Sequence, residues 1–288
     1  MKIVFCKIDK LNNIHSNRRE INIEKVNNYI LKTVIFFVGW AILISFAPDI
    51  QTNNKALLRL WWEFVPLSLV VLFSFIFVLV IEKDKIKIPL ASRFFKNSLI
   101  GVVIGFLWLG SVVAVLLLTK TMNIHDQNNI DYIWIWILAS LLNSVMQELL
   151  MRGYLYQLWK QKYNVVVATV LTTILFSAMH GGAFEALIIP VLNVVTMSIL
   201  VTLLLEYTGT IIAPIIAHFT WNTIGAIIFG GVSLASDYPN LFNSTFQGNP
   251  LLSGGIYKIE GSIIVLAVNL ILITYLFIIN KRVSSQYG

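Results

Sequence analysis

The chain has 288 residues, of which 57% are hydrophobic and only 12% are charged, with a mean hydropathy of +0.79. Soluble domains carry about 25% charged residues, so this composition excludes an ordinary soluble domain and indicates a polytopic membrane protein. A net charge of +7 would suggest nucleic-acid binding in a soluble protein. In a membrane protein it reflects the Lys and Arg of cytoplasmic loops, so we expect no nucleic-acid partner.

The N-terminal residues 1–28 carry six Lys and Arg side chains ahead of the first long apolar segment. They lack the short apolar core and cleavage site of a signal peptide, so we expect a cytoplasmic N-terminal segment and a first span that is retained. Cys6 is the only cysteine. The sequence therefore predicts no intramolecular disulfide and no cysteine-based metal site.

Eight apolar segments approach or exceed the roughly 20 residues that a helix needs to cross a bilayer. They are continuous runs without the alternation of a membrane β-strand. The predicted fold class is therefore all-α, a polytopic transmembrane helix bundle of about eight spans. The predicted spans are about 29–47, 61–81, 98–118, 132–157, 164–180, 185–205, 211–230 and 261–280.

The chain is divided into five parts along these segments, without an internal repeat or a soluble domain. They are the cytoplasmic segment 1–28, the N-terminal transmembrane helices 29–130, the core helices 131–230 that carry three motifs, the external loop 231–260, and the last transmembrane helix with a cytoplasmic tail, 261–288. The loop is assigned from its Gly, Ser, Asn and Pro content.

The distribution of cations predicts the orientation in the membrane. A cytoplasmic N-terminus assigns 17 of the 21 Lys and Arg residues to the inside and leaves only Lys55, Arg59, Lys120 and Lys258 outside. This asymmetry is typical of the positive-inside rule. We expect a multi-pass protein with both termini in the cytoplasm. The abundance of Ile, Asn and Lys suggests an AT-rich bacterial genome and hence the cell membrane.

Polar and ionisable side chains interrupt the fourth apolar segment. Gln147 and Glu148 are followed, about one helical turn later, by Arg152. Charged groups inside a membrane span cost about 2.5–3.5 kcal/mol each on insertion scales, which makes them candidates for a functional site. Glu148 and Arg152 could instead form an intrahelical ion pair near the membrane interface.

Two histidines lie in or at the ends of later apolar segments. His180 precedes two glycines that predict a helix end, while His218 and Asn222 lie four residues apart and share a helix face. Each could also be an interfacial or helix-packing residue. Together with Glu148, however, they bring a candidate base, a second proton acceptor and donors for an oxyanion from three helices.

The three strings resemble the motifs of the CPBP intramembrane proteases, also called the CAAX protease and bacteriocin-processing, or Abi, family. The family order E-E-x-x-x-R, F-x-x-x-H and H-x-x-x-N corresponds here to Gln147–Gly153, Phe176–His180 and His218–Asn222, within about residues 140–225. The resemblance implies an eight-helix-type membrane core. It also implies hydrolysis of a peptide bond, within or beside the lipid bilayer, in a peptide or membrane-protein substrate.

The resemblance also implies roles for individual residues. Glu148 and His180 would activate a water molecule, and His218 and Asn222 would face the scissile carbonyl oxygen. Desolvation in the membrane would have to make the Glu148 carboxylate basic enough for this role.

Orienting roles and the absence of a cofactor follow from the same resemblance. Arg152 would position the carboxylate, and Gln147 could hold the water by hydrogen bonds. The family's mechanism implies no cofactor and no metal. A zinc ion on His180, His218 and Glu148 is the alternative, because three such ligands can complete an open zinc site.

Gln147 departs from the family pattern, in which the first glutamate of the pair usually acts as the base. An amide cannot take up this proton. Glu148 could serve instead, although it lies about 100° round the helix from position 147. Alternatively, the chain is a catalytically impaired relative that acts as a membrane scaffold or bacteriocin-immunity protein. We favour an active protease over this alternative, and over a transporter, for which paired broken helices are missing.

The depth of the three motifs sets a condition on the fold. At about 1.5 Å per residue from the turn near 160–163, Glu148 and His218 reach similar depths. His180 comes out farther across the membrane. An irregular or tilted helix must close this gap if the motifs form one site.

Overall fold

The computed structural model describes residues 26–90, 92–186, 188–232 and 238–287. Most of the predicted cytoplasmic N-terminal segment, including Cys6, lies outside the described residues. The chain divides into two compact units, Met1–Phe46 and Ala47–Gly288. In the first unit the described residues form one apolar helix, Val26–Ser45, at the position of the first predicted span.

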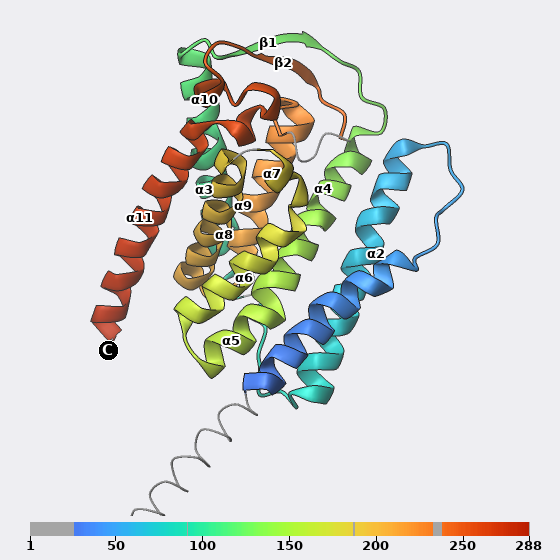
Figure 1. The fold of residues 1–288 in the computed structure, drawn as a ribbon, viewed down its shortest axis with the longest axis vertical. Helices are drawn as coiled ribbons and strands as arrows, with labels where there is room; N and C mark the ends of the chain where they lie inside the picture. Colours follow the sequence, from blue (N-terminus) through green and yellow to red (C-terminus); the bar gives the residue numbers. More distant parts are fainter. Residues whose placement is uncertain (1–25, 91, 187, 233–237, 288) are drawn as a thin grey trace, which may run out of the picture. The chain divides into compact units, whose positions relative to one another are not determined.

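The second unit is a bundle of helices (Figure 1). Its first half contains two helices that continue into π-helical segments. Its helices are α2 (Lys55–Phe75) with η1 (Ile76–Ile81), α3 (Phe94–Leu118), and α4 (Ile133–Glu148) with η2 (Leu149–Leu155) and α5 (Tyr156–Lys162).

The second half of the unit begins with two helices around the second motif. The third motif follows on a helix that again continues as a π-helix. These helices are α6 (Val165–Met179), α7 (Gly181–Glu185), α8 (Ile188–Thr208), α9 (Ile212–Asn222) with η3 (Thr223–Ile228), and α11 (Ile263–Tyr287).

Six helices among the described residues are long and apolar enough to cross a membrane. They confirm a multi-pass, all-α membrane protein. The fifth and seventh predicted spans correspond to the shorter apolar helices Val165–Met179 and Ile212–Ile228. The predicted total of eight spans stays a prediction.

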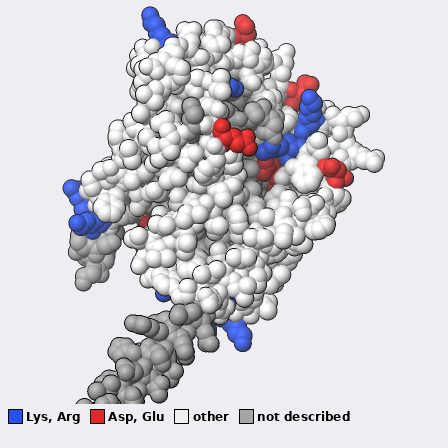
Figure 2. Space-filling model, in the orientation of Figure 1, with Lys and Arg blue, Asp and Glu red and all other residues white. Residues whose placement is uncertain are grey.

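The outer faces of these helices are apolar. Large side chains such as Phe95, Leu99, Val166 and Ile271 are each more than 60% exposed. Figure 2 shows uncharged residues over most of the helical surface on one face, with charged side chains at its edges and in one group in its upper half. A soluble monomer rarely exposes so much contiguous apolar surface, whereas lipid contact explains it.

Short strands and helical turns cover one end of the bundle (Figure 1). The loop expected at 231–260 contributes β2 (Phe242–Phe246), which pairs antiparallel with β1 (Met122–Gln127). It continues through α10 (Pro250–Ser253), η5 (Gly255–Tyr257) and η6 (Ile259–Gly261). This two-stranded sheet was not predicted, because its strands lie far apart in the sequence.

Two glycines bring α3 and α9 close together. A Cβ on Gly101 would lie 2.7 Å from the Ala213 carbonyl oxygen, and one on Gly105 would lie 2.7 Å from Thr220 Cβ. Small residues allow such close packing between membrane helices, where hydrophobic burial supplies little driving force. The contact sets the position of α9, which carries the third motif.

Candidate functional site

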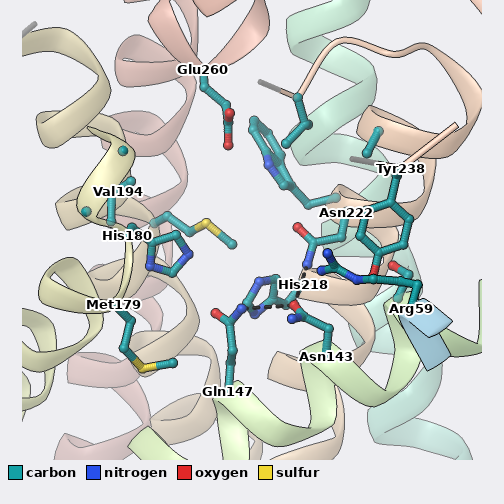
Figure 3. Close-up of a pocket in the computed structure, with 17 residues that line it drawn as sticks. Arg59, Asn143, Gln147, Met179, His180, Val194, His218, Asn222, Tyr238 and Glu260 are labelled. Carbon is teal, nitrogen blue, oxygen red and sulfur yellow. Dashed lines mark hydrogen bonds between the residues drawn. The ribbon is translucent and has the colours of Figure 1, made fainter. Parts of the chain in front are cut away.

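A cavity of about 370 Å³ lies inside the second unit (Figure 3). Polar side chains from α4, from the residue between α6 and α7, and from α9 line one part of it. The structure therefore brings the three sequence motifs together at one cavity. These polar lining residues are Asn143, Gln147, His180, His218 and Asn222.

Glu148 lies behind His218 and is not among the residues that line the cavity. Its Oε1 atom accepts a hydrogen bond from His218 Nδ1 at 2.9 Å, and both side chains are almost completely buried. A carboxylate only accepts hydrogen bonds, so this contact places the ring proton on Nδ1 and leaves Nε2 of His218 as an acceptor. The arrangement is that of an imidazole oriented by a buried carboxylate.

Arg152 connects this pair to α8. Its Nη1 atom lies 3.5 Å from Glu148 Oε1, and its Nη2 atom donates to the Ser198 carbonyl oxygen and hydroxyl at 2.8 Å each. Nε donates to Thr202 Oγ1 at 3.3 Å, and the guanidinium lies over the Phe176 ring. Arg152 thus balances the Glu148 charge inside the protein and fixes its position.

His180 reaches the same cavity from the end of α6. Its Nδ1 atom lies 2.8 Å from the Phe176 carbonyl oxygen, which can only accept, so Nε2 is again left as an acceptor. The Phe176 ring lies 4.4 Å from the His180 ring and 6.1 Å from the His218 ring, measured between centroids. His180 reaches the cavity where α6 ends at Met179 and the chain turns.

Gln147, and not Glu148, faces the cavity. Neighbouring side chains on a helix point about 100° apart. Because Gln147 faces the cavity, Glu148 faces α9 instead. The Gln147 Nε2 atom donates to Asn143 Oδ1 at 2.9 Å, while its Oε1 atom is buried without a hydrogen-bond partner. Asn222 Nδ2 makes long contacts of 3.5 Å to Asn143 Oδ1 and 3.4 Å to Ser144 Oγ.

Sequence reasoning missed a polar group on the other side of Asn143. Asn143 Nδ2 donates to Glu63 Oε2 at 2.9 Å, and Arg59 pairs with the same carboxylate at 2.5 Å. Arg59, Tyr238 and Glu260 also line the cavity. The available signal in the sequence was a carboxylate and a cation, Glu63 and Arg59, one turn apart in an apolar helix.

Tyr238, in the loop after η3, contacts this polar group. Its ring lies 4.4 Å from the Arg59 guanidinium, and its hydroxyl donates to Glu63 Oε1 at 3.4 Å. Burial raises the pKa of the Tyr238 hydroxyl, and the nearby Glu63 carboxylate raises it further. The hydroxyl is therefore a stable hydrogen-bond donor at neutral pH.

The alternative zinc site does not fit this geometry. Glu148 binds the Nδ1 side of His218, whereas the free acceptor Nε2 lies on the opposite side of the ring. An ion on the two Nε2 atoms of His180 and His218 would therefore lie beyond the reach of Glu148. The described residues contain no group of three or more His, Cys, Asp and Glu side chains that could hold a metal.

Residues 129–224 match the family model described as Type II CAAX prenyl endopeptidase Rce1-like. The match covers about a third of the chain and contains all three motifs. It confirms the resemblance predicted from the motifs. No curated protein and no solved structure matches the chain.

Proposed function

We propose that this multi-pass membrane protein, a member of the Rce1-like type II CAAX prenyl endopeptidase family over residues 129–224, is an intramembrane endopeptidase. Its substrate is a membrane-associated or lipidated peptide or protein. The observation that carries the proposal is the cavity in which His180, His218 and Asn222 meet, with His218 oriented by the buried Glu148.

His218 is the proposed general base. Its neutral Nε2 atom takes a proton from water while the water oxygen attacks the scissile carbonyl carbon. The imidazolium then gives this proton to the leaving amine nitrogen as the C–N bond breaks. Glu148 acts through His218, because its carboxylate fixes the tautomer and stabilises the imidazolium that forms. This assigns Glu148 a role different from direct activation of water.

The remaining cavity residues hold the water and the oxyanion. Water has two O–H groups: one donates to His218 Nε2, and the other is held between Gln147 Oε1 and His180 Nε2, which places the water for attack. Asn222 lies at the cavity with only long hydrogen bonds from its amide, so it can turn its NH₂ group towards the oxyanion. Arg152 keeps the Glu148 carboxylate in place. The reaction needs no metal and no cofactor.

The volume of the cavity and the matched family guide the choice of substrate. A volume of about 370 Å³ falls within the range of small-ligand sites and accommodates a few residues of an extended peptide. The name of the matched family describes cleavage of prenylated proteins. We propose the cell membrane as its location, from the Ile, Asn and Lys content, and cytoplasmic termini, from the distribution of its Lys and Arg residues.

A second function is favoured by one observation, the amide of Gln147 at the cavity wall. If a carboxylate at this position is indispensable, the chain is a catalytically impaired relative that binds a peptide or partner in the same cavity. A membrane scaffold or bacteriocin-immunity protein would then be the functional form.

A cleavage assay in proteoliposomes separates the two functions. Prenylated and unprenylated peptide libraries are incubated with the wild type, His218→Ala and Gln147→Glu. The matched control is His125→Ala, since His125 is an exposed histidine on β1. We expect His218→Ala to lower kcat by about 10²–10⁴-fold, the usual contribution of a general base.

Each result has one interpretation. Cleavage by the wild type that persists in His218→Ala would contradict the proposed base. An inactive wild type together with an active Gln147→Glu variant would establish the impaired relative. Loss of cleavage in His125→Ala as well would indicate general damage to the fold and not the removal of a base.

A further inference from the structure

Glu63 is a buried carboxylate that the mechanism above does not use. It lies on α2, outside the matched residues 129–224, and is 3% exposed. Three donors surround it, namely Arg59 at 2.5 Å, Asn143 Nδ2 at 2.9 Å and the Tyr238 hydroxyl at 3.4 Å. A buried carboxylate in a membrane helix requires such partners. Asn143 joins it to α4, and Tyr238 joins it to the loop after η3.

The carboxylate determines how two amides are turned. An ionised carboxylate only accepts hydrogen bonds, so Asn143 must point its NH₂ group at Glu63. The Oδ1 atom of Asn143 is then the group that faces Gln147. Gln147 must in turn offer its NH₂ group to this oxygen, which leaves its own Oε1 as the atom directed away from Asn143.

The Gln147 oxygen that results is buried and has no hydrogen-bond partner. It belongs to a residue of the cavity wall, as do the two histidines whose Nε2 atoms are acceptors. A buried acceptor without a partner is costly unless a donor fills the space in front of it. Water, with two O–H groups, is a donor that such a wall can hold.

We propose that Glu63 is a positioning residue that acts through Asn143 to hold the Gln147 carbonyl oxygen in the cavity as an acceptor for the attacking water. This inference rests on the proposed endopeptidase function. It also explains how position 147 keeps a hydrogen-bond acceptor although it has lost the basicity of a glutamate. Proton uptake lies with His218, and orientation of the water lies with Gln147.

Reversing the direction of the hydrogen bonds tests the inference without any substrate. In Gln147→Glu, two carboxylates compete for the single NH₂ group of Asn143. In the double variant Glu63→Gln/Gln147→Glu, Asn143 donates to Glu at 147 and accepts from Gln at 63. We expect the thermal midpoint of the double variant in detergent to exceed the value for additive effects by about 4 °C or more.

Kinetics test the effect on water. Glu63→Gln removes the charge that fixes the amides, so we expect a kcat about 10- to 100-fold lower with KM changed less than about twofold. The matched control is Glu82→Gln, which alters a buried carboxylate bonded to Tyr154 and should leave kcat unchanged.

The thermal midpoints and the kinetics can each contradict the inference independently. If the change in thermal midpoint of the double variant equals the sum of the changes in the two single variants, Glu63 does not orient Gln147. This result would overturn the inference, whatever the activity. Coupled midpoints with an unchanged kcat in Glu63→Gln, or an equal loss in Glu82→Gln, would also overturn it. If the wild type cleaves nothing, the endopeptidase function fails, and the midpoints alone decide whether Glu63 holds the Gln147 amide.

Discussion

At the scale of single residues, the buried charges of Glu148 and Arg152 combine a structural and a chemical task. The two groups compensate each other's charge inside the bundle, and Glu148 also accepts a hydrogen bond from His218 Nδ1. Loss of either charge alone leaves the other buried without compensation, so stability and activity fall together. A paired substitution can separate the two tasks.

We predict that Glu148→Gln lowers the free energy of unfolding by about 3–5 kcal/mol, because it leaves the Arg152 charge buried without its partner. The double variant Glu148→Gln/Arg152→Met should recover much of this stability, since neutral replacement of a buried ion pair is often close to neutral. It should not recover cleavage, because the imidazolium of His218 still lacks a carboxylate. Denaturant unfolding and the proteoliposome assay measure the two quantities. Recovery of cleavage in the double variant would refute the role of Glu148.

At the scale of elements, the position of His218 depends on the contact between α3 and α9. This contact is close because Gly101 and Gly105 have no side chains, and Trp108 stacks on Trp221 at 4.4 Å between centroids beside them. Trp108 also donates to Asn269 Oδ1 on α11 at 2.6 Å. Three helices are thereby held together behind the cavity.

A larger residue at Gly101 should therefore move α9 and the site that it carries. Gly101→Val is expected to lower the free energy of unfolding by about 1–3 kcal/mol, the usual effect of overpacking. Gly110→Ala on the same helix is the control, since nothing lies within 4 Å of its added Cβ. Circular dichroism during thermal unfolding in detergent measures the change. Equal stability of the two variants would argue against close packing of α3 on α9.

At the scale of the whole molecule, the charge distribution predicts which connections face the cytoplasm. Asp126 on β1 and Gln161 on α5 are both exposed and belong to connections on opposite sides in the predicted topology. In a Cys6→Ser background, Asp126→Cys should react with a membrane-impermeant maleimide on intact cells, whereas Gln161→Cys should react only after lysis. The reverse pattern would overturn the predicted orientation.

Much of the architecture was predictable because long apolar segments in lipid have one solution, the helix. Each of the eight predicted spans corresponds to an apolar helix, although only six are long enough by themselves to count as spans. The sheet of β1 and β2 was not predictable, since its strands are short, polar and far apart in the sequence. The end of α6 at Met179 followed from Gly181 and Gly182, but the position of His180 in the cavity wall did not.

By itself, the sequence determined that three polar motifs lie on separate membrane helices, because charge and amide groups stand out in an apolar chain. Only the tertiary structure decided that Gln147 faces the cavity and that Glu148 faces His218. It alone also joined Glu63 to Asn143, a partner 80 positions away. The physical reason is that the direction of a hydrogen bond depends on which group lies opposite, and the groups opposite come from helices distant in the sequence.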